Sequence, residues 1–281
     1  MSVDTFRPEV WAAELLLELR NRLVYGSVAN RQYEGEIRDY GDTVNINSIS
    51  RPTVATYTPN STTITPEQLT TAQRKLLIDQ AKYFAFEIDD VDARQVRGDL
   101  IPQAMSESAY ALSDVADGYI ASLYVDAQAA NTISATAVTS GAIAYSQLNK
   151  LRTKLDEASV PKSGRWAILP PWYVELLLED DRLVRLDASG SQEGLREGMV
   201  GRMLGFDIWE SNNTPTLDSG DDSVVVAGYP GAISYAEQIA KVEAYRPEDG
   251  FADAVKGLHL YGAKVVRPDG IATLQASKSA V

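Results

Sequence analysis

Apolar residues recur at helical spacing near the start of the chain. They stand at every fourth position: Trp11, Leu15, Leu19 and Leu23. This spacing predicts an amphipathic helix that begins near Pro8 and ends at Gly26. Its apolar face must be covered, and the sequence leaves open whether its own domain or a neighbouring subunit covers it.

Strand-like alternation marks residues 40–88. Val44 and Ile46 alternate with polar residues on the outgoing side, and the return side carries Phe84, Phe86 and Ile88. Between them, residues 58–72 contain six threonines and two prolines and little that can form a core. The sequence therefore predicts a long hairpin whose polar tip either rests on another molecule or forms a flexible loop.

The longest predicted helix covers residues 99–128, with Asp99 as its N-cap and Pro102 in its first turn. Residues 127–149 carry no charge and are rich in Ala, Ser, Thr and Gly. This change in composition predicts a linker with a weak strand, and hence a domain boundary.

Helices and strands alternate after this linker. Leu148, Leu151 and Leu155 mark a helix that Pro161 stops, and a helix through Leu178 follows Pro170. A buried strand is predicted at 166–169, and further strands are predicted at 206–209 and 224–227. The last forty residues predict an antiparallel group made of 239–245, 254–266 and 271–274. The fold class expected from these elements is α+β.

Charge and composition exclude several classes of function. The 281 residues carry 39 acids, 26 bases, a net charge of −13, one histidine and no cysteine. This balance disfavours tight DNA binding, and the lack of cysteine excludes disulfides and thiolate zinc sites. We expect neither a signal peptide nor a membrane-spanning segment.

No motif predicts a catalytic, cofactor or metal site. Gly198, Gly201 and Gly205 fit a turn before a strand better than a phosphate loop. His259 fits a structural role on a strand, because no nucleophile motif accompanies it. The acidic clusters, which we expect to be solvated loop charge rather than cation sites, are Asp89-Asp90-Asp92 and Asp218-Asp221-Asp222.

Acidic charge is concentrated between residues 87 and 126, a segment that contains nine acidic and two basic residues. One interpretation is an ordinary solvated helix face. The other is a surface that lies near nucleic acid without binding it.

Two stretches of the chain resemble a known family. Residues 194–196 with 201–212 (GRMLGFDIWESN), and residues 254–268 (AVKGLHLYGAKVVRP), are similar to segments of the major capsid proteins of tailed double-stranded DNA bacteriophages. The order of predicted elements resembles that family over essentially the whole chain. The resemblance implies the Hong Kong ninety-seven type of fold and a structural rather than enzymatic role, with no cofactor.

The resemblance also names the parts of the chain. Residues 1–35 would form an N-terminal arm, and 36–88 an extended loop that lies over the neighbouring subunit. Residues 89–128 and 245–281 would form a peripheral domain with its spine helix, and 129–244 an axial domain.

The implied assembly is an icosahedral shell of hexamers and pentamers in the virion, built in the host cytoplasm around double-stranded DNA. A separate scaffolding protein and a portal are the further implied partners. The residues expected at subunit interfaces are Trp11, Leu15, Leu19, Ile46, Ile49, Arg51 and Tyr57. Asp114 and Asp117 are expected to face the lumen. An encapsulin-like compartment shell and an enzyme with an unrecognised site remain as alternatives.

Overall fold

The computed structural model describes residues 23–32, 43–49, 53–60, 63, 67–68, 71–89, 100–179, 199–217, 222–247 and 252–278. Trp11, Leu15, Leu19 and Arg51 lie outside the described residues, as do the caps at Pro8 and Asp99 and the acids at 90, 92, 218 and 221. No helix in the described part of the chain is long and apolar enough to cross a membrane.

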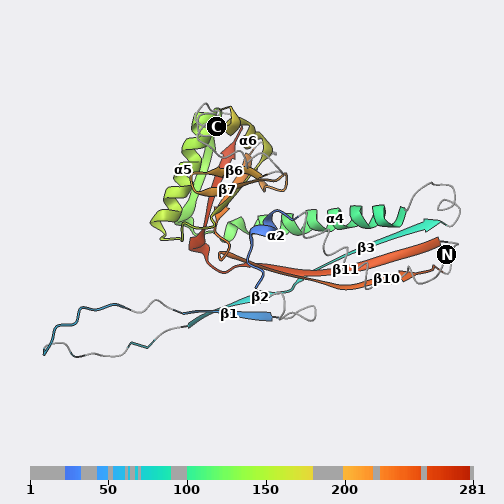
Figure 1. The fold of residues 1–281 in the computed structure, drawn as a ribbon, viewed down its shortest axis with the longest axis horizontal. Coiled ribbons are helices and arrows are strands. Elements are labelled where there is room, and N and C mark those ends of the chain that lie inside the picture. The colour runs from blue at the N-terminus through green and yellow to red at the C-terminus, as the bar shows by residue number, and fades with distance from the viewer. Residues whose placement is uncertain are drawn as a thin grey trace.

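The upper layer of the molecule is a seven-stranded mixed sheet (Figure 1). Its strands, in spatial order, are β4 (Thr132–Ala137), β12 (Ile271–Ser277), β9 (Asp222–Gly228), β5 (Trp166–Leu169), β7 (Phe206–Glu210) and β6 (Met199–Met203), and β8 (Thr216–Leu217) pairs with β9. Two helices, α5 (Gly141–Glu157) and α6 (Pro171–Leu178), pack on this sheet.

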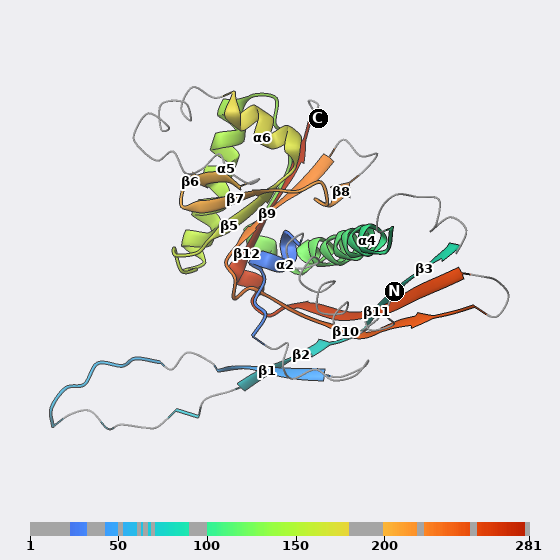
Figure 2. The ribbon, with the colours of Figure 1, turned by 45° about the vertical axis from the view of Figure 1, so that its right-hand side comes forward.

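The lower layer is a three-stranded antiparallel sheet, and the longest helix lies along one face of it (Figures 1 and 2). The strands are β10 (Ile233–Tyr245), β11 (Ala252–Val265) and β3 (Gln80–Asp89), and the helix is α4 (Leu100–Ser122). A separate hairpin of β1 (Thr43–Ile49) and β2 (Thr71–Leu77) lies beside this sheet, and the short helix α2 (Tyr25–Val28) packs against α4.

Two-residue alternation buries both faces of the upper sheet. On β5, Ala167 and Leu169 face the core formed with α5 and α6, whereas Trp166 and Ile168 face a second core. This second core also contains residues of α2, α4, β10 and β11. Because one apolar cluster is shared, the two layers are packed together rather than merely linked.

The chain passes from the lower sheet to the upper sheet through a tight 3₁₀ turn, Pro268–Gly270. The Gln128 amide donates to the Pro268 carbonyl at 3.0 Å, and Asn131 Nδ2 donates to the Asp269 carbonyl at 2.8 Å. A Cβ on Gly270 would lie 2.6 Å from the Tyr229 ring, so only glycine fits here without movement. This junction is therefore held by hydrogen bonds and by packing.

Many predicted elements are confirmed at nearly the expected positions. They include α4, β5, α6, β7, β9 and β11. The glycine-rich stretch also forms the predicted turn: Leu204 and Gly205, with φ of 53° and 85°, connect β6 to β7 as a two-residue hairpin turn.

Three predictions about the elements are wrong. The strand that carries Phe84 does not return to residues 43–49 but pairs with β11, and the true return strand is β2. The uncharged stretch 127–149 contains the predicted weak strand, which is β4, but it is not otherwise a linker, because the first two turns of α5 also lie in it. Gly26 does not end a helix but lies within α2.

The predicted antiparallel C-terminal group is also wrong in part. β10 and β11 pair with each other, but β12 leaves them for the upper sheet, where it lies between β4 and β9. A strict division at residue 244 therefore places β12 in the wrong layer. It also places all of β10 except Tyr245 in the wrong layer, because hydrogen bonding assigns the whole of β10 to the lower sheet.

Candidate subunit-interaction surfaces

The β1–β2 hairpin is anchored to the lower sheet by a small apolar core. Val44 and Ile46 of β1 and Leu76 of β2 are at most 5% exposed, and they cluster with Ala236 and Leu260 of β10 and β11. Ile46 was expected at a subunit interface, and this is wrong for the described chain because its side chain is buried within its own subunit. Ile49 is the last residue of strand β1, but its side chain is not among those described, so its expected interface role stays a prediction.

A close backbone approach fixes where this hairpin lies. A Cβ on Gly262 of β11 would overlap the carbonyl oxygen of Leu77 and approach Ile78. Glycine is therefore required at this position, because the β2 backbone passes directly over it.

Beyond the hairpin, the described residues of the connecting excursion have no core. Residues 53–60 are all exposed, with Val54 94% and Tyr57 63% accessible. A hydrogen bond of 2.9 Å from the Thr53 amide to Glu67 Oε2 spans the excursion. Apolar side chains this exposed on a monomer favour contact with another molecule, so Tyr57 stays a predicted interface residue.

The two acids expected to share one surface of α4 lie in different environments. Asp114 is exposed, and its backbone carbonyl accepts a hydrogen bond of 3.4 Å from Asn213 Nδ2. Asp117 is 2% exposed, and its carboxylate accepts hydrogen bonds from the amides of Val24 at 2.6 Å and Gly26 at 3.1 Å. The prediction that Asp117 faces a lumen is therefore wrong: it binds the backbone of the N-terminal segment.

Burial has an electrostatic cost at Asp117. Loss of solvation raises the pKa of this carboxyl from 3.8 to about 6, against the opposing effect of the backbone hydrogen bonds and of Arg31. Burial likewise raises the pKa of Tyr25 well above its usual range, and the charge of Asp117 adds to this.

A buried ion pair holds the same N-terminal segment to the lower sheet. Arg31 Nη1 lies 2.8 Å from Glu237 Oε1, and Tyr235 donates a hydrogen bond of 2.7 Å to Glu237 Oε2. Burial alone would raise the pKa of Glu237, but His259, Arg31 and Tyr235 outweigh it and lower the pKa to about 2. Residues 23–32 are thus fixed to α4 by Asp117 and to the sheet by Glu237.

His259 belongs to this buried group. Its side chain is fully buried, its Nε2 atom lies 3.4 Å from Glu237 Oε2, and its ring lies against Tyr261 with 5.0 Å between centroids. A group enclosed in this way has no access to a substrate, which agrees with the structural role expected for it. In the described ranges, no group of three or more His, Asp or Glu side chains is arranged to hold a metal ion.

Comparison with known proteins adds independent evidence. The family model described as "Phage capsid protein" matches residues 73–274. No curated protein matches the chain. A solved structure of Mycobacterium phage Che8 contains a chain that is 34% identical, with 90% of each chain covered and a TM-score of 0.72.

More distant structures share the fold alone. The capsid structure of cyanophage P-SCSP1u gives a TM-score of 0.68 at 17% identity, covering 89% of this chain and 86% of that one. An encapsulin from Synechococcus elongatus gives 0.61 at 10% identity, covering 87% and 85%. Since the family model spans well over half of the sequence and the Che8 chain matches nearly all of it, the chain belongs to the phage capsid protein family, and its α+β architecture is the Hong Kong ninety-seven type of fold.

Proposed function

We propose that this capsid protein is the major subunit of a closed icosahedral shell, in which hexamers and pentamers enclose a double-stranded DNA genome. The observation that carries the proposal is the excursion between β1 and β2. Its described residues bury nothing in their own subunit, yet they present Val54 and Tyr57. A segment of this length costs about 1–2 kcal/mol of conformational entropy for each residue that is ordered, so contacts with a neighbouring subunit must offset it.

The proposed parts of the subunit follow the hydrogen-bonded sheets. The excursion and hairpin, residues 43–77, form the extended loop. The peripheral domain contains β3, α4, β10 and β11, and the axial domain contains the strands and helices of residues 129–228 together with β12. Residues before Leu23 form the arm.

The protein acts structurally in this proposal, in the virion shell, after assembly in the host cytoplasm with a separate scaffolding protein and a portal. The net charge of −13 suits a container for DNA that does not bind it tightly. Exposed acids of α4, with Asp114 as the representative, face the lumen. The encapsulin alternative is less well supported, because the encapsulin chain shares the fold at 10% identity while the Che8 phage chain is 34% identical.

The test replaces residues 50–70 with a short Gly-Ser turn between β1 and β2. Because the described part of this segment is exposed, the subunit should keep its circular dichroism spectrum, and shortening the loop should stabilise it by roughly 1 kcal/mol. Closed particles, measured by sedimentation and electron microscopy with any scaffold co-expressed, should fall at least ten-fold.

A full-length loop carrying Tyr57→Asp separates contact from length. It should also lower particle yield, whereas Thr58→Ser, which keeps the adjacent position polar, should not. Normal particles from the shortened variant would contradict the proposal. Protection of nucleic acid from nuclease in the wild-type particles distinguishes a genome container from a cargo compartment.

A further inference from the structure

Basic charge is concentrated in one part of an otherwise acidic chain. Residues 148–165 contain five bases and two acids, while the whole chain has a net charge of −13. The bases are Lys150, Arg152, Lys154, Lys162 and Arg165. They lie on the C-terminal half of α5 and on the turn that leads into β5.

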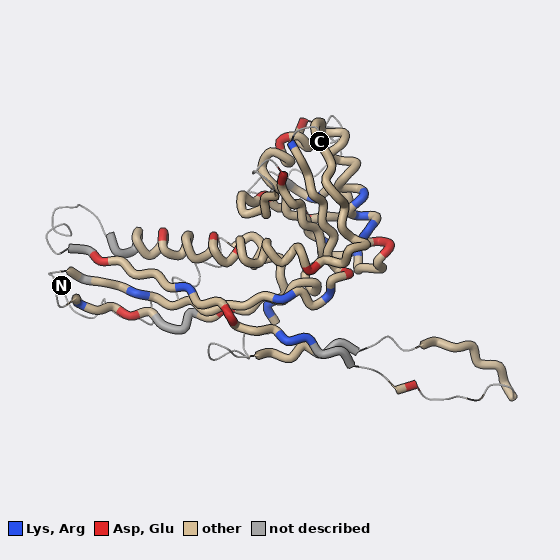
Figure 3. The backbone as a smooth tube through the Cα atoms, turned by 180° about the vertical axis from the view of Figure 1, so that it is seen from behind, with Lys and Arg blue, Asp and Glu red and all other residues tan. Residues whose placement is uncertain are grey.

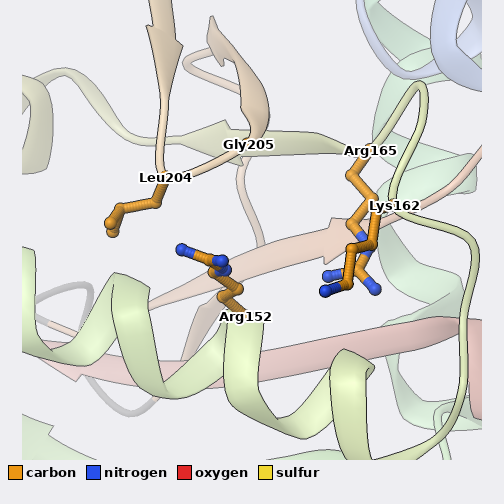
Figure 4. A pocket seen from close by; sticks show the side chains of 5 residues that line it. All are labelled: Arg152, Lys162, Arg165, Leu204 and Gly205. Carbon is orange, nitrogen blue, oxygen red and sulfur yellow. The ribbon is translucent and has the colours of Figure 1, made fainter.

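Three of these side chains converge on one pocket (Figure 4). Arg152 points into it from α5, Lys162 and Arg165 approach from the turn before β5, and the Leu204–Gly205 turn forms the other side. The cavity has a volume of about 220 Å³. This space suits the ends of one or two side chains rather than a large ligand.

The pocket keeps excess positive charge. Arg165 is satisfied, because it is 3% exposed, lies 2.8 Å from Asp156 Oδ1 and donates to the carbonyls of Val160 and Pro161. Arg152 is 41% exposed and lies 3.7 Å from the other oxygen of Asp156. Lys162 is exposed and makes no ion pair with any described residue. Asp156 is thus shared between Arg152 and Arg165, and Lys162 adds a third cation to the pocket, so the pocket has an excess of positive charge that favours binding of a further anion.

A matching acidic surface lies on α6. Glu175 and Glu179 are exposed and one turn apart, so they point to the same side, and Leu178 between them is 53% exposed. Neither glutamate forms an ion pair within the described part of the chain. The sequence continues directly with Asp180 and Asp181.

The basic pocket and the acidic surface lie at opposite ends of α5. Tyr173 of α6 donates a hydrogen bond of 2.8 Å to the Ala144 carbonyl, in the first turn of α5. Arg152 lies eight residues further on, which corresponds to roughly 12 Å along the helix axis. Figure 3 shows blue segments gathered along the outer side of the upper layer, with red segments both beside them and near the top. One chain cannot bring these two surfaces together.

We propose that the pocket formed by Arg152 and Lys162 binds the carboxylates of Glu175 and Glu179 on a second copy of this chain. The contact joins two different surfaces of identical subunits. Each subunit therefore presents its basic pocket to one neighbour and its acidic surface to the other, and repeated head-to-tail contacts of this kind close into a ring if the rotation between neighbours divides the full circle. This inference rests on the proposed shell function and specifies an axial-domain contact that would hold neighbouring subunits in a capsomer.

Charge reversal tests the pairing directly. The pocket variant Arg152→Glu with Lys162→Glu, and the helix variant Glu175→Lys with Glu179→Lys, should each reduce closed particles at least ten-fold. The variant with all four changes should recover most of the yield, because opposite charges face each other again. Lys150→Glu is the matched control: residues two apart on a helix do not share a face, so it should leave the yield unchanged.

Chemical cross-linking of introduced cysteines gives a second readout that needs no complete shell. The chain contains no cysteine, so Arg152→Cys with Glu179→Cys introduces the only two thiols. Because an arginine–glutamate pair holds the two backbones too far apart for a direct disulfide, a short flexible bis-maleimide should link the concentrated protein into a ladder of subunits on a denaturing gel, whereas Lys150→Cys with Glu179→Cys should not.

Three results overturn the pairing: reversed variants that fold and assemble normally, a four-fold variant without recovery, or no ladder from the cysteine pair. Loss of packaged DNA alone, with normal particles, would instead identify the pocket as a phosphate-binding site and also overturn it. Absence of shells from the wild-type protein, together with a ladder from the Arg152→Cys, Glu179→Cys variant, would contradict the proposed function and leave the pairing supported.

Discussion

Replacing Asp117 with asparagine should change how the stability of the subunit depends on pH. The carboxyl has a pKa of about 6 in the folded protein and an ordinary value of 3.8. Between these two values the folded state binds more protons than the unfolded state. Its contribution to stability is therefore fully present below pH 3.8 and is lost as the pH rises through 6.

The size of the effect follows from the two pKa values. Integrated between pH 8 and pH 4.5, the proton linkage of this one group stabilises the wild-type fold by about 2 kcal/mol. Asparagine keeps one oxygen acceptor but has no titration. In the wild type, one carboxylate oxygen accepts a hydrogen bond from the Val24 amide and the other accepts one from the Gly26 amide. In the asparagine variant, an NH₂ group replaces one of these oxygens and faces one of the two backbone N–H groups, so two donors meet. An unsatisfied buried donor costs about 1–3 kcal/mol.

These contributions predict a stability difference between variant and wild type that widens as the pH falls. At pH 8 the variant should be within about 2 kcal/mol of the wild type, since removal of a buried charge offsets the mismatched amide. At pH 4.5 it should be less stable relative to the wild type by a further 2 kcal/mol or so. Urea unfolding of the unassembled subunit across this pH range measures the difference.

Asp114→Asn is the control for this experiment, because Asp114 lies on the same helix with its side chain exposed. Subtracting wild-type from variant stabilities removes the contribution of other groups, including Glu237, whose lowered pKa acts in the opposite direction. A difference for Asp117→Asn that stays constant from pH 8 to pH 4.5 would refute the reasoning.

Two further substitutions probe the anchoring of the hairpin and of the arm. Gly262→Ala should destabilise the subunit by about 1–3 kcal/mol in urea unfolding, because the new methyl group meets the backbone of Leu77; Gly118→Ala, in open space within α4, should instead stabilise it by roughly 0.5–1 kcal/mol. Leu15→Asp combined with Leu19→Asp should abolish particles while the monomer stays folded, since a charge in an apolar contact costs several kcal/mol; unchanged particle yield would count against an interface role for the arm.

Elements with strong local signals were predictable from the sequence. The strand 166–169 and the helix after Pro170 appear almost as expected, because a fully apolar run and a proline pair define them locally. The pairing of β3 with β11 was not predictable in this way. Its residues are far apart in the chain, and alternation in residues 80–89 suits either partner equally. The start of α5 was missed because an uncharged run of small residues lacks an amphipathic pattern.

The buried polar groups were the least predictable part. Asp117 lies on the same buried face of α4 as Ser113 and Ile120. Its position in the helical repeat therefore indicated burial, but the many acids in this segment favoured the interpretation of a solvated surface. Glu237 was a lone acid in the largely apolar stretch 231–240, and such an acid requires a cation. Its partner Arg31 comes from more than two hundred residues earlier, and no local pattern connects them.

The junction at residues 267–270 has a mechanical consequence for the whole particle. This turn, which carries the chain from β11 of the lower sheet to β12 of the upper sheet, is held by hydrogen bonds to the carbonyls of Pro268 and Asp269 and by packing of the Tyr229 ring against Gly270. A joint fastened on both sides resists bending, so we expect the angle between the layers to be nearly constant from one copy to the next. Differences in curvature between five-fold and six-fold positions would then arise at the interfaces between subunits and in the long excursion between β1 and β2, while each subunit keeps nearly the same internal geometry.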